Sequence, residues 1–362
     1  MLRAGLWEQT VCISQYGEVD YAAIYQMASD QSVVGLVAAG IEHAGDISIP
    51  KKAMLHFAQR VLQFESRNAK MNAYIGELVS SLRAAGINPL LVKGQGIARC
   101  YAKPEWRAAG DIDLLFADKE DYERAKALLL PSASAVHVEN TYLRHIGMTL
   151  SGWEVELHGS LYTRLSKRID NFVDRVQEDT FANRHVRELD LAGIKLEVPA
   201  PDNDVIFVFT HILHHFYIEG IGLRQICDWC RLLWTFRDSI DVPLLEERLK
   251  AMGLMSEWKA FAAYAVDYLG LPPEAMPLYS AGNKWKRKAV RINSFVMKVG
   301  NFGYKRRVER TAKTRSYLWH KIRSVFYKTG DYARHTLIFP LDSPRFFCHL
   351  LVDGIGAAKR GE

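Results

Sequence analysis

The sequence predicts an α+β fold in which a mixed-sheet core lies between N-terminal helices and a C-terminal all-helical region. Apolar residues recur at helical spacing from about Lys51 to Ala85. Short apolar runs separated by glycine turns follow from residue 86 to about 200, a pattern typical of strands. Helical patterning returns after Pro199-Ala200-Pro201. We therefore expect three domains, covering residues 1–85, 86–200 and 201–362.

The core segment alternates between strand and helix patterns. The first long helix ends before Gly86 and Pro89, and the apolar run 90–92 predicts a short strand. A short helix over 94–101, a strand over 111–116 and a helix over 119–130 follow. Two strand pairs are expected around the turn dipeptides Ser151-Gly152 and Ala192-Gly193, and they cover residues 143–150 with 153–158 and 186–191 with 194–198.

The C-terminal region has helical patterning throughout. Asp202 is expected to cap a helix that reaches about Ile218, and another helix is predicted over 223–236. Further helices follow to near Tyr268, and from Ala281 the chain is basic and helical.

Composition indicates an ordinary globular protein. The 362 residues are 49% hydrophobic and 24% charged, which suffices for two or three packed units. The five cysteines are odd in number and scattered, so a reducing compartment is favoured over a disulfide framework. Met1-Leu2-Arg3 does not lead into a secretion signal, and no apolar run reaches the ~18 residues of a spanning helix. We expect a cytoplasmic protein.

The net charge of +6 is concentrated in the segment 284–334, where only Glu309 and Asp331 oppose many basic residues. Aromatic residues are interleaved with these charges. Such a segment can bind nucleic acid through phosphates and stacking, or lie on an anionic membrane surface. The third interpretation is that these are solvated helix faces with aromatic core positions.

Two aspartates in one predicted strand are the first candidates for chemistry. Side chains two residues apart in a strand share a face, so Asp111 and Asp113 project together while Ile112 faces the core. Strand interiors are depleted in aspartate, and two like charges on one face are unfavourable unless a cation lies between them. The pattern therefore favours a metal site over a merely solvated strand edge.

A third carboxylate comes from the predicted strand 153–158. Glu156 and His158 share one face of that strand, and Glu154 has the same parity as a less favoured candidate. Three carboxylates on one sheet face can hold two divalent ions, which stabilise the attacking and leaving oxygens of a displacement at phosphorus.

A glycine-containing segment precedes the aspartates. Lys93-Gly94-Gln95-Gly96 joins a strand to the start of a helix, where backbone N–H groups can approach a phosphate. Arg107 lies in the following loop, where its guanidinium fork could clamp a phosphate.

These motifs resemble the DNA polymerase β-like nucleotidyltransferase superfamily. The closer resemblance is to the nucleotidyltransferase group called NTP_transf_5, and it spans about residues 55–240. Its hallmarks are similar to Lys93-Gly94, Arg107-x-x-Gly110-Asp111-x-Asp113 and Glu156-x-His158, and the segments 211–215 and 224–229 also fit.

The resemblance implies a polymerase β-like mixed-sheet core with a metal site. It implies that Asp111 and Asp113 bind two Mg²⁺ ions, with Mn²⁺ as the alternative, and that Glu156 completes the site. Gly94 would face the triphosphate of an NTP such as ATP. The superfamily has Gly-Ser where this chain has Gly94-Gln95, so Lys93 or Gln95 is expected to replace the serine contact. Arg107 and His158 are the other expected nucleotide contacts.

The expected activity is transfer of NMP from an NTP to an unidentified hydroxyl acceptor, with release of pyrophosphate. Two alternatives stay open. A sugar-nucleotide glycosyltransferase would use the Asp-x-Asp pair with one metal ion and without a third carboxylate. A nucleotide-binding or nucleic-acid-binding module would have a degenerate catalytic site and use the basic segment.

Two further clusters are interpreted as structural. His211, His214 and His215 have helical spacing that could hold Zn²⁺, but no neighbouring cysteine or acidic residue completes a tetrahedral ligand set, so packing or hydrogen bonding to the catalytic unit is favoured. Cys227 and Cys230 lie in an apolar helical stretch, where buried packing is favoured over a redox or zinc role.

Overall fold

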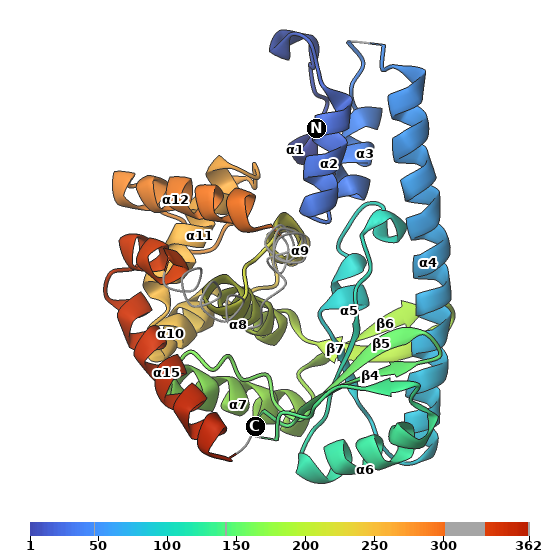
Figure 1. Cartoon of the computed structure of the whole chain (residues 1–362), viewed down its shortest axis with the longest axis vertical. Coiled ribbons are helices and arrows are strands. Elements are labelled where there is room, and N and C mark those ends of the chain that lie inside the picture. Colours follow the sequence, from blue (N-terminus) through green and yellow to red (C-terminus); the bar gives the residue numbers. More distant parts are fainter. Residues whose placement is uncertain (47, 142, 301–329, 361–362) are drawn as a thin grey trace, which may run out of the picture. The chain divides into compact units, whose positions relative to one another are not determined.

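The computed structural model describes residues 1–360 apart from 47, 142 and 301–329 (Figure 1). These residues form two compact units. The sheet unit comprises Ile49–Tyr162 and Asp170–Val208, and the helical unit comprises Met1–Ser48, Thr163–Ile169 and Phe209–Glu362. Each unit combines segments that are distant in the sequence, and the domain boundaries expected at residues 85 and 200 stay a prediction.

A mixed five-stranded sheet forms the centre of the sheet unit, which confirms the predicted α+β class. The strand order is β1-β2-β5-β4-β3, and β2 pairs in parallel with β5 while the other neighbours are antiparallel. The strands are β1 (Leu90–Val92), β2 (Ile112–Leu115), β3 (Ala135–Val136), β4 (His145–Leu150) and β5 (Trp153–His158).

One face of this sheet packs against two helices. The helices α4 (Lys51–Ala84) and α6 (Lys119–Leu129) share a single apolar core with the sheet. In α4, Met71, Ile75 and Leu78 are buried at helical spacing, and in β2 the alternate residues Ile112 and Leu114 meet them. Because apolar side chains occupy this face, the intervening residues of β2 and β5 project from the opposite face.

Two hairpins complete the sheet unit. The strands β4 and β5 flank Ser151-Gly152, and β6 (Val186–Leu191) and β7 (Ile194–Pro199) flank Ala192-Gly193. Both residues of each turn have positive φ, between 50° and 84°. This conformation matches the right-handed twist of the strands and fixes a two-residue turn. Both predicted strand pairs are therefore confirmed.

Helices make up most of the helical unit. They are α1 (Leu2–Trp7), α2 (Tyr21–Asp30), α3 (Val34–Glu42), α8 (Pro201–Ile218), α9 (Leu223–Thr235), α10 (Val242–Met252), α11 (Met255–Asp267), α12 (Asn283–Val299), the helical residues 330–338 and α15 (Asp342–Arg360). The helices α7 (Lys167–Ala182) and α8 each contribute residues to both units. Because α8 already begins at Pro201, Asp202 lies in its first turn rather than at the expected cap. Short 3₁₀ turns and the remaining loops connect these elements.

Aromatic side chains form the centre of the helical unit. Phe209 stacks on Trp229 with ring centroids 5.4 Å apart, and Trp258 meets both rings edge-on at 4.8 and 5.0 Å. Cys227 and Cys230 are buried in α9 as free thiols, and burial raises the pKa of both. Thiols of this kind behave as small apolar groups.

Among the described residues, no helix combines the length and the apolar character needed to cross a membrane. The cytoplasmic location stays a prediction.

The helices α1 and α3 cross at two glycines. A Cβ atom added at Gly5 would clash with the carbonyl oxygen of Leu36 and lie 2.6 Å from the amide nitrogen of Gly40. Backbone atoms cannot move aside as a flexible side chain can, so Gly5→Ala should lower the free energy of unfolding by about 2–4 kcal/mol. Urea denaturation measures the change. Gly45→Ala is the control, because a Cβ there would meet no heavy atom within 4 Å; an equal loss in both variants would contradict the explanation.

A buried glutamate should make the stability depend on pH. Glu257 of α11 is fully buried and accepts a hydrogen bond of 3.1 Å from the hydroxyl of Tyr217. Burial, reinforced by Asp342 and opposed by Lys288, raises the pKa of Glu257 to about 8, compared with 4.5 for an ordinary glutamate. Between these values the folded state keeps a proton that the unfolded chain releases, so stability falls as pH rises from 4.5 to about 8.

Glu257→Gln should remove this pH dependence. Glutamine resembles the protonated acid, so the variant should become more stable than the unchanged protein by on the order of a few kcal/mol at pH 9, and by little at pH 5. Urea denaturation at pH 5, 7 and 9 measures the difference. The exposed Glu274 provides the control Glu274→Gln, and parallel pH profiles for the unchanged protein and Glu257→Gln would refute the assignment.

Candidate active site

The three predicted carboxylates come together on one face of the sheet. Asp111 precedes β2, Asp113 lies within it, and Glu156 is the direct neighbour of Asp113 across the parallel β2–β5 pair. Residues in register on neighbouring strands share a face, and so do residues two apart in one strand. As a result, one ligand oxygen from each of the three side chains lies within 4.8 Å of the other two.

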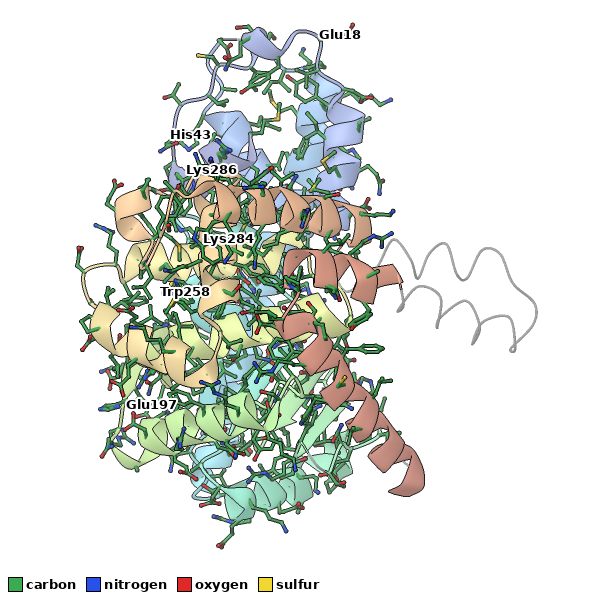
Figure 2. The ribbon with its side chains drawn as sticks, turned by 90° about the vertical axis from the view of Figure 1, so that its left-hand side faces the viewer. Glu18, His43, Glu197, Trp258, Lys284 and Lys286 are labelled. Carbon is green, nitrogen blue, oxygen red and sulfur yellow. The ribbon has the colours of Figure 1, made fainter. Side chains whose placement is uncertain are left out.

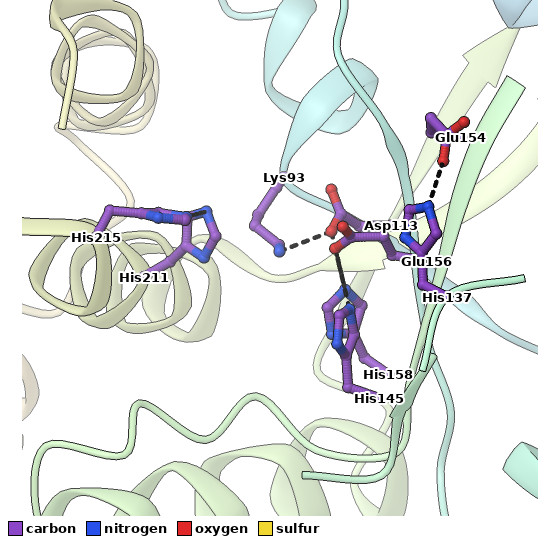
Figure 3. A network of polar contacts seen from close by, with 9 residues as sticks. All are labelled: Lys93, Asp113, His137, His145, Glu154, Glu156, His158, His211 and His215. Carbon is purple, nitrogen blue, oxygen red and sulfur yellow. Dashed lines mark hydrogen bonds and ion pairs between the residues drawn. The ribbon is translucent and has the colours of Figure 1, made fainter. Parts of the chain in front are cut away.

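A lysine ammonium lies against this cluster (Figure 3). Nζ of Lys93 is 2.7 Å from Oδ1 of Asp113, and both side chains are almost fully buried. Burial by itself would lower the pKa of Lys93, but the carboxylates of Asp113, Glu156 and Asp111 outweigh it, and the pKa is raised. Burial would likewise raise the pKa of Asp113, which Lys93 and His158 instead hold below its usual value. The site is therefore built around ionised carboxylates and a cation.

Two stacked histidines hold the same carboxylates. Nε2 of His158 lies 2.9 Å from Oδ1 of Asp113 and 3.5 Å from Oε2 of Glu156, while Nε2 of His145 lies 3.2 Å from the latter oxygen. The imidazole rings stack with centroids 4.7 Å apart. Burial lowers the pKa of His158, and so does Lys93, but the hydrogen bonds to Asp113 and Glu156 produce a net increase. Burial would raise the pKa of Glu156, yet the two histidines and Lys93 lower it.

His145 was not among the predicted site residues, although the sequence contained a signal for it. The two-residue turn Ser151-Gly152 sets the pairing of β4 with β5, and in that register His145 is directly opposite His158. Counting outward from the turn would have placed His145 beside the predicted Glu156-x-His158 motif.

Glu154, the alternative third carboxylate, has other partners. Its Oε1 accepts a hydrogen bond of 2.7 Å from the hydroxyl of Thr149, and its Oε2 lies 3.8 Å from Nε2 of His137. Figure 3 shows this contact beside the main cluster. Among the described residues, the three carboxylates that lie close enough to share a metal ion are those of Asp111, Asp113 and Glu156. Glu154 does not belong to this set.

The turn from β1 into the short helix α5 (Gly94–Ala98) is strained. Lys93 has φ 56° and ψ −145°, a conformation in which residues other than glycine are rare, and Gly94 has φ 37°. Such a residue costs of order 1–3 kcal/mol and is found mainly at functional sites. A Cβ atom at Gly94 would lie 3.4 Å from the carbonyl oxygen of Asp111, so the turn lies close to the backbone of this candidate metal ligand. The helix is shorter than the expected 94–101, and with five residues it adds little dipole.

Gln95 connects the turn to α4. Its buried amide donates a hydrogen bond of 2.7 Å to Oδ1 of Asn68, and Nδ2 of Asn68 donates to the carbonyl oxygens of Glu105 at 2.7 Å and Arg107 at 2.8 Å. This chain of bonds holds the loop that carries Arg107, which is itself buried. Gln95 therefore positions the loop, and the nucleotide contact expected from its side chain stays a prediction without support from this geometry.

The histidines of α8 make hydrogen bonds, and the expected contact with the catalytic unit stays a prediction. Nε2 of His211 and Nε2 of His215 are 3.0 Å apart, and Nδ1 of His214 lies 2.8 Å from the carbonyl oxygen of Thr163. The expectation that no acidic residue lies nearby is wrong, because Oε2 of Glu219 is 3.0 Å from Nδ1 of His215. His214, His215 and Glu219 thus form a further group whose ligand atoms are close enough to share an ion.

The basic segment is described only in part. Lys284 and Lys286 lie near the start of α12 and are labelled in Figure 2. Nζ of Lys288 lies 2.9 Å from the hydroxyl oxygen of Ser256. The guanidinium of Arg291 donates a hydrogen bond to the carbonyl oxygen of Leu337. The remaining basic and aromatic positions from 302 to 319 lie outside the described residues, so the nucleic-acid and membrane interpretations stay predictions.

The family model described as "Uncharacterised nucleotidyltransferase" (NTP_transf_5) matches residues 17–270, which include every predicted site residue. The chain is also similar to the crystal structure of an antigenic nucleotidyltransferase-like protein from Paracoccidioides brasiliensis, with 16% sequence identity and a TM-score of 0.32. That similarity covers 49% of this chain and 85% of the other. No match to a curated protein was found.

Asn68 should be important for stability because its buried side chain bonds three partners. Asn68→Ala would leave the carbonyl oxygens of Glu105 and Arg107 without this donor and the Gln95 amide without this acceptor. We expect the free energy of unfolding to fall by about 2–4 kcal/mol, measured by urea denaturation. In the control Asn183→Ala, the lost hydrogen bond to Asp179 is exposed, so the change should stay below about 1 kcal/mol. Similar losses in the two variants would contradict the bridging role.

Proposed function

This chain belongs to the uncharacterised nucleotidyltransferase family, and we propose that it is a metal-dependent enzyme that transfers NMP from an NTP to a hydroxyl acceptor. The observation that carries the proposal is the convergence of Asp111, Asp113 and Glu156 within 4.8 Å beside the strained Lys93-Gly94 turn. In the reaction, the acceptor hydroxyl loses its proton to solvent and its oxygen forms a bond to the α-phosphorus. The bond from this phosphorus to the bridging oxygen breaks, and pyrophosphate leaves.

The residues of the cluster fit a divalent cation. Carboxylate oxygens are the ligands that Mg²⁺ and Mn²⁺ favour, and three of them converge here. Nζ of Lys93 lies 2.7 Å from Oδ1 of Asp113, so its ammonium also contributes a positive charge to the cluster. When bound, Mg²⁺ ions would lower the pKa of the attacking hydroxyl and offset charge on the leaving oxygens.

The chain's own residues have distinct roles in this proposal. Asp111, Asp113 and Glu156 supply the ligand oxygens, and the hydrogen bonds from His158 and His145 orient the last two carboxylates. Lys93 is the positively charged side chain at the turn, which suits it to bind the phosphates in place of the superfamily's serine. The hydrogen bonds from His158 and His145 to the carboxylates are already formed, so these ligands need little reorganisation when a metal ion binds.

A nucleotide-binding module without turnover is the second candidate. One observation favours it: where the superfamily has serine, the Gln95 side chain donates to Asn68 in the interior. The glycosyltransferase alternative has less support, because Glu156 joins the aspartates in a three-carboxylate group that such an enzyme does not need.

Substitutions of the carboxylates test catalysis. Asp113→Asn and Glu156→Gln should each lower pyrophosphate release by at least about 10³-fold, because each removes a charged ligand. Release is measured with each NTP and Mg²⁺ over a panel of alcohols, sugars, protein side chains and RNA ends. Circular dichroism verifies that the variants fold.

Glu154→Gln is the matched control. It removes a carboxylate from the same strand, two residues before Glu156, and should keep near-normal activity. Retained pyrophosphate release in Glu156→Gln would contradict the three-carboxylate site. Release of a nucleoside diphosphate from a sugar nucleotide that Glu156→Gln leaves unchanged would favour the glycosyltransferase alternative. Metal-dependent NTP binding by the unchanged protein without pyrophosphate release over the whole panel would favour the binding module.

A further inference from the structure

Lys93 lies where a metal ion would be needed. Its Nζ is 2.7 Å from Oδ1 of Asp113, the side chain is 13% exposed, and its charge interacts with all three carboxylates of the candidate site. A divalent ion bound through this oxygen would meet the ammonium group there. Two positive charges close together in a buried site repel, so Lys93 and the ion compete for Asp113.

The structure also suggests why Lys93 can leave. An ammonium on a flexible four-carbon stem is a single point charge with no fixed geometry, in contrast to an arginine fork. The same Asp113 oxygen is also 2.9 Å from Nε2 of His158, so the carboxylate stays anchored when Lys93 departs. The backbone of Lys93 is in a strained conformation next to Gly94, whose φ is also positive, and this is the segment expected to face the phosphates.

We propose that Lys93 is an exchangeable internal cation, which neutralises the carboxylates until a divalent ion displaces it and frees its ammonium for the phosphates of the nucleotide. This inference rests on the proposed function and adds a regulatory property to it. Metal binding and nucleotide binding are then coupled, because the ion releases a group that the nucleotide uses. Coupling between two ligands is reciprocal, so the nucleotide also raises the affinity for the ion.

Direct metal binding tests the displacement. Free Mn²⁺ is counted by electron paramagnetic resonance during titration of the unchanged protein and of Lys93→Gln, without nucleotide. Lys93→Gln should bind Mn²⁺ about tenfold more tightly, because the competing cation is gone. Lys195→Gln is the matched control: it lowers the net charge equally from an exposed position on β7, where the lysine pairs with Glu188, and should bind like the unchanged protein.

The outcomes separate the two ideas. Equal or weaker Mn²⁺ binding by Lys93→Gln, with clear binding by the unchanged protein, would overturn the displacement and leave the metal-dependent function standing. Absence of Mn²⁺ binding in both proteins would overturn both. A tenfold gain that also appears in Lys195→Gln would reflect net charge alone and would likewise overturn the displacement.

A second measurement uses the unchanged protein, in case Lys93→Gln does not fold. Lysines are acylated with acetic anhydride, with and without Mg²⁺, and each site is quantified by mass spectrometry. Displacement predicts that Mg²⁺ increases modification of Lys93 by about threefold or more, since its ammonium loses its partner, while Lys195 is unchanged. Unchanged or reduced modification of Lys93 at saturating Mg²⁺ would contradict the inference.

Discussion

The parallel pairing of β2 with β5 is the constraint on which the candidate site depends. It sets Asp113 directly beside Glu156 and Leu115 beside His158, so acidic and imidazole groups from segments more than forty residues apart share one face. On the opposite face of the sheet, Ile112, Leu114 and their apolar neighbours pack against α4 and α6. Because side chains alternate along a strand, burial of the apolar set determines where the charged set projects. Packing of the core and placement of the site residues thus depend on the same strand alternation.

Electrostatic balance is the second organising feature. Three carboxylates at this spacing repel one another, and Lys93 and His158 compensate by direct contact with Asp113. Lys93 lies beside Asp113 with a backbone conformation that residues other than glycine rarely adopt. A protein that needed only a stable sheet would use apolar residues at these positions, since replacing buried ion pairs by such residues is often neutral or stabilising. Their presence supports a role in binding.

Much of the fold follows from local patterns in the sequence. Short apolar runs identified the strands other than β3, which was not predicted from the sequence. The dipeptides Ser151-Gly152 and Ala192-Gly193 identified both hairpins, because each turn type demands particular backbone angles. The three carboxylates were predictable for the same reason, since strand parity is a local property. The bridge from Gln95 through Asn68 to the Arg107 loop was not, because it joins segments whose proximity only the packing of α4 determines. His145 was predictable in principle but required the hairpin register as well as the motif.

The tight turn between β4 and β5 has an evolutionary consequence. Insertion of one residue there would shift β4 by one position, so that His145 would face the apolar core and Ile146 the polar face, while the β2–β5 ladder stayed intact. Length variation at this loop would therefore separate the imidazole pair several residues away, although most surface loops tolerate such variation. Relatives that retain the imidazole pair should also retain a connection of two residues.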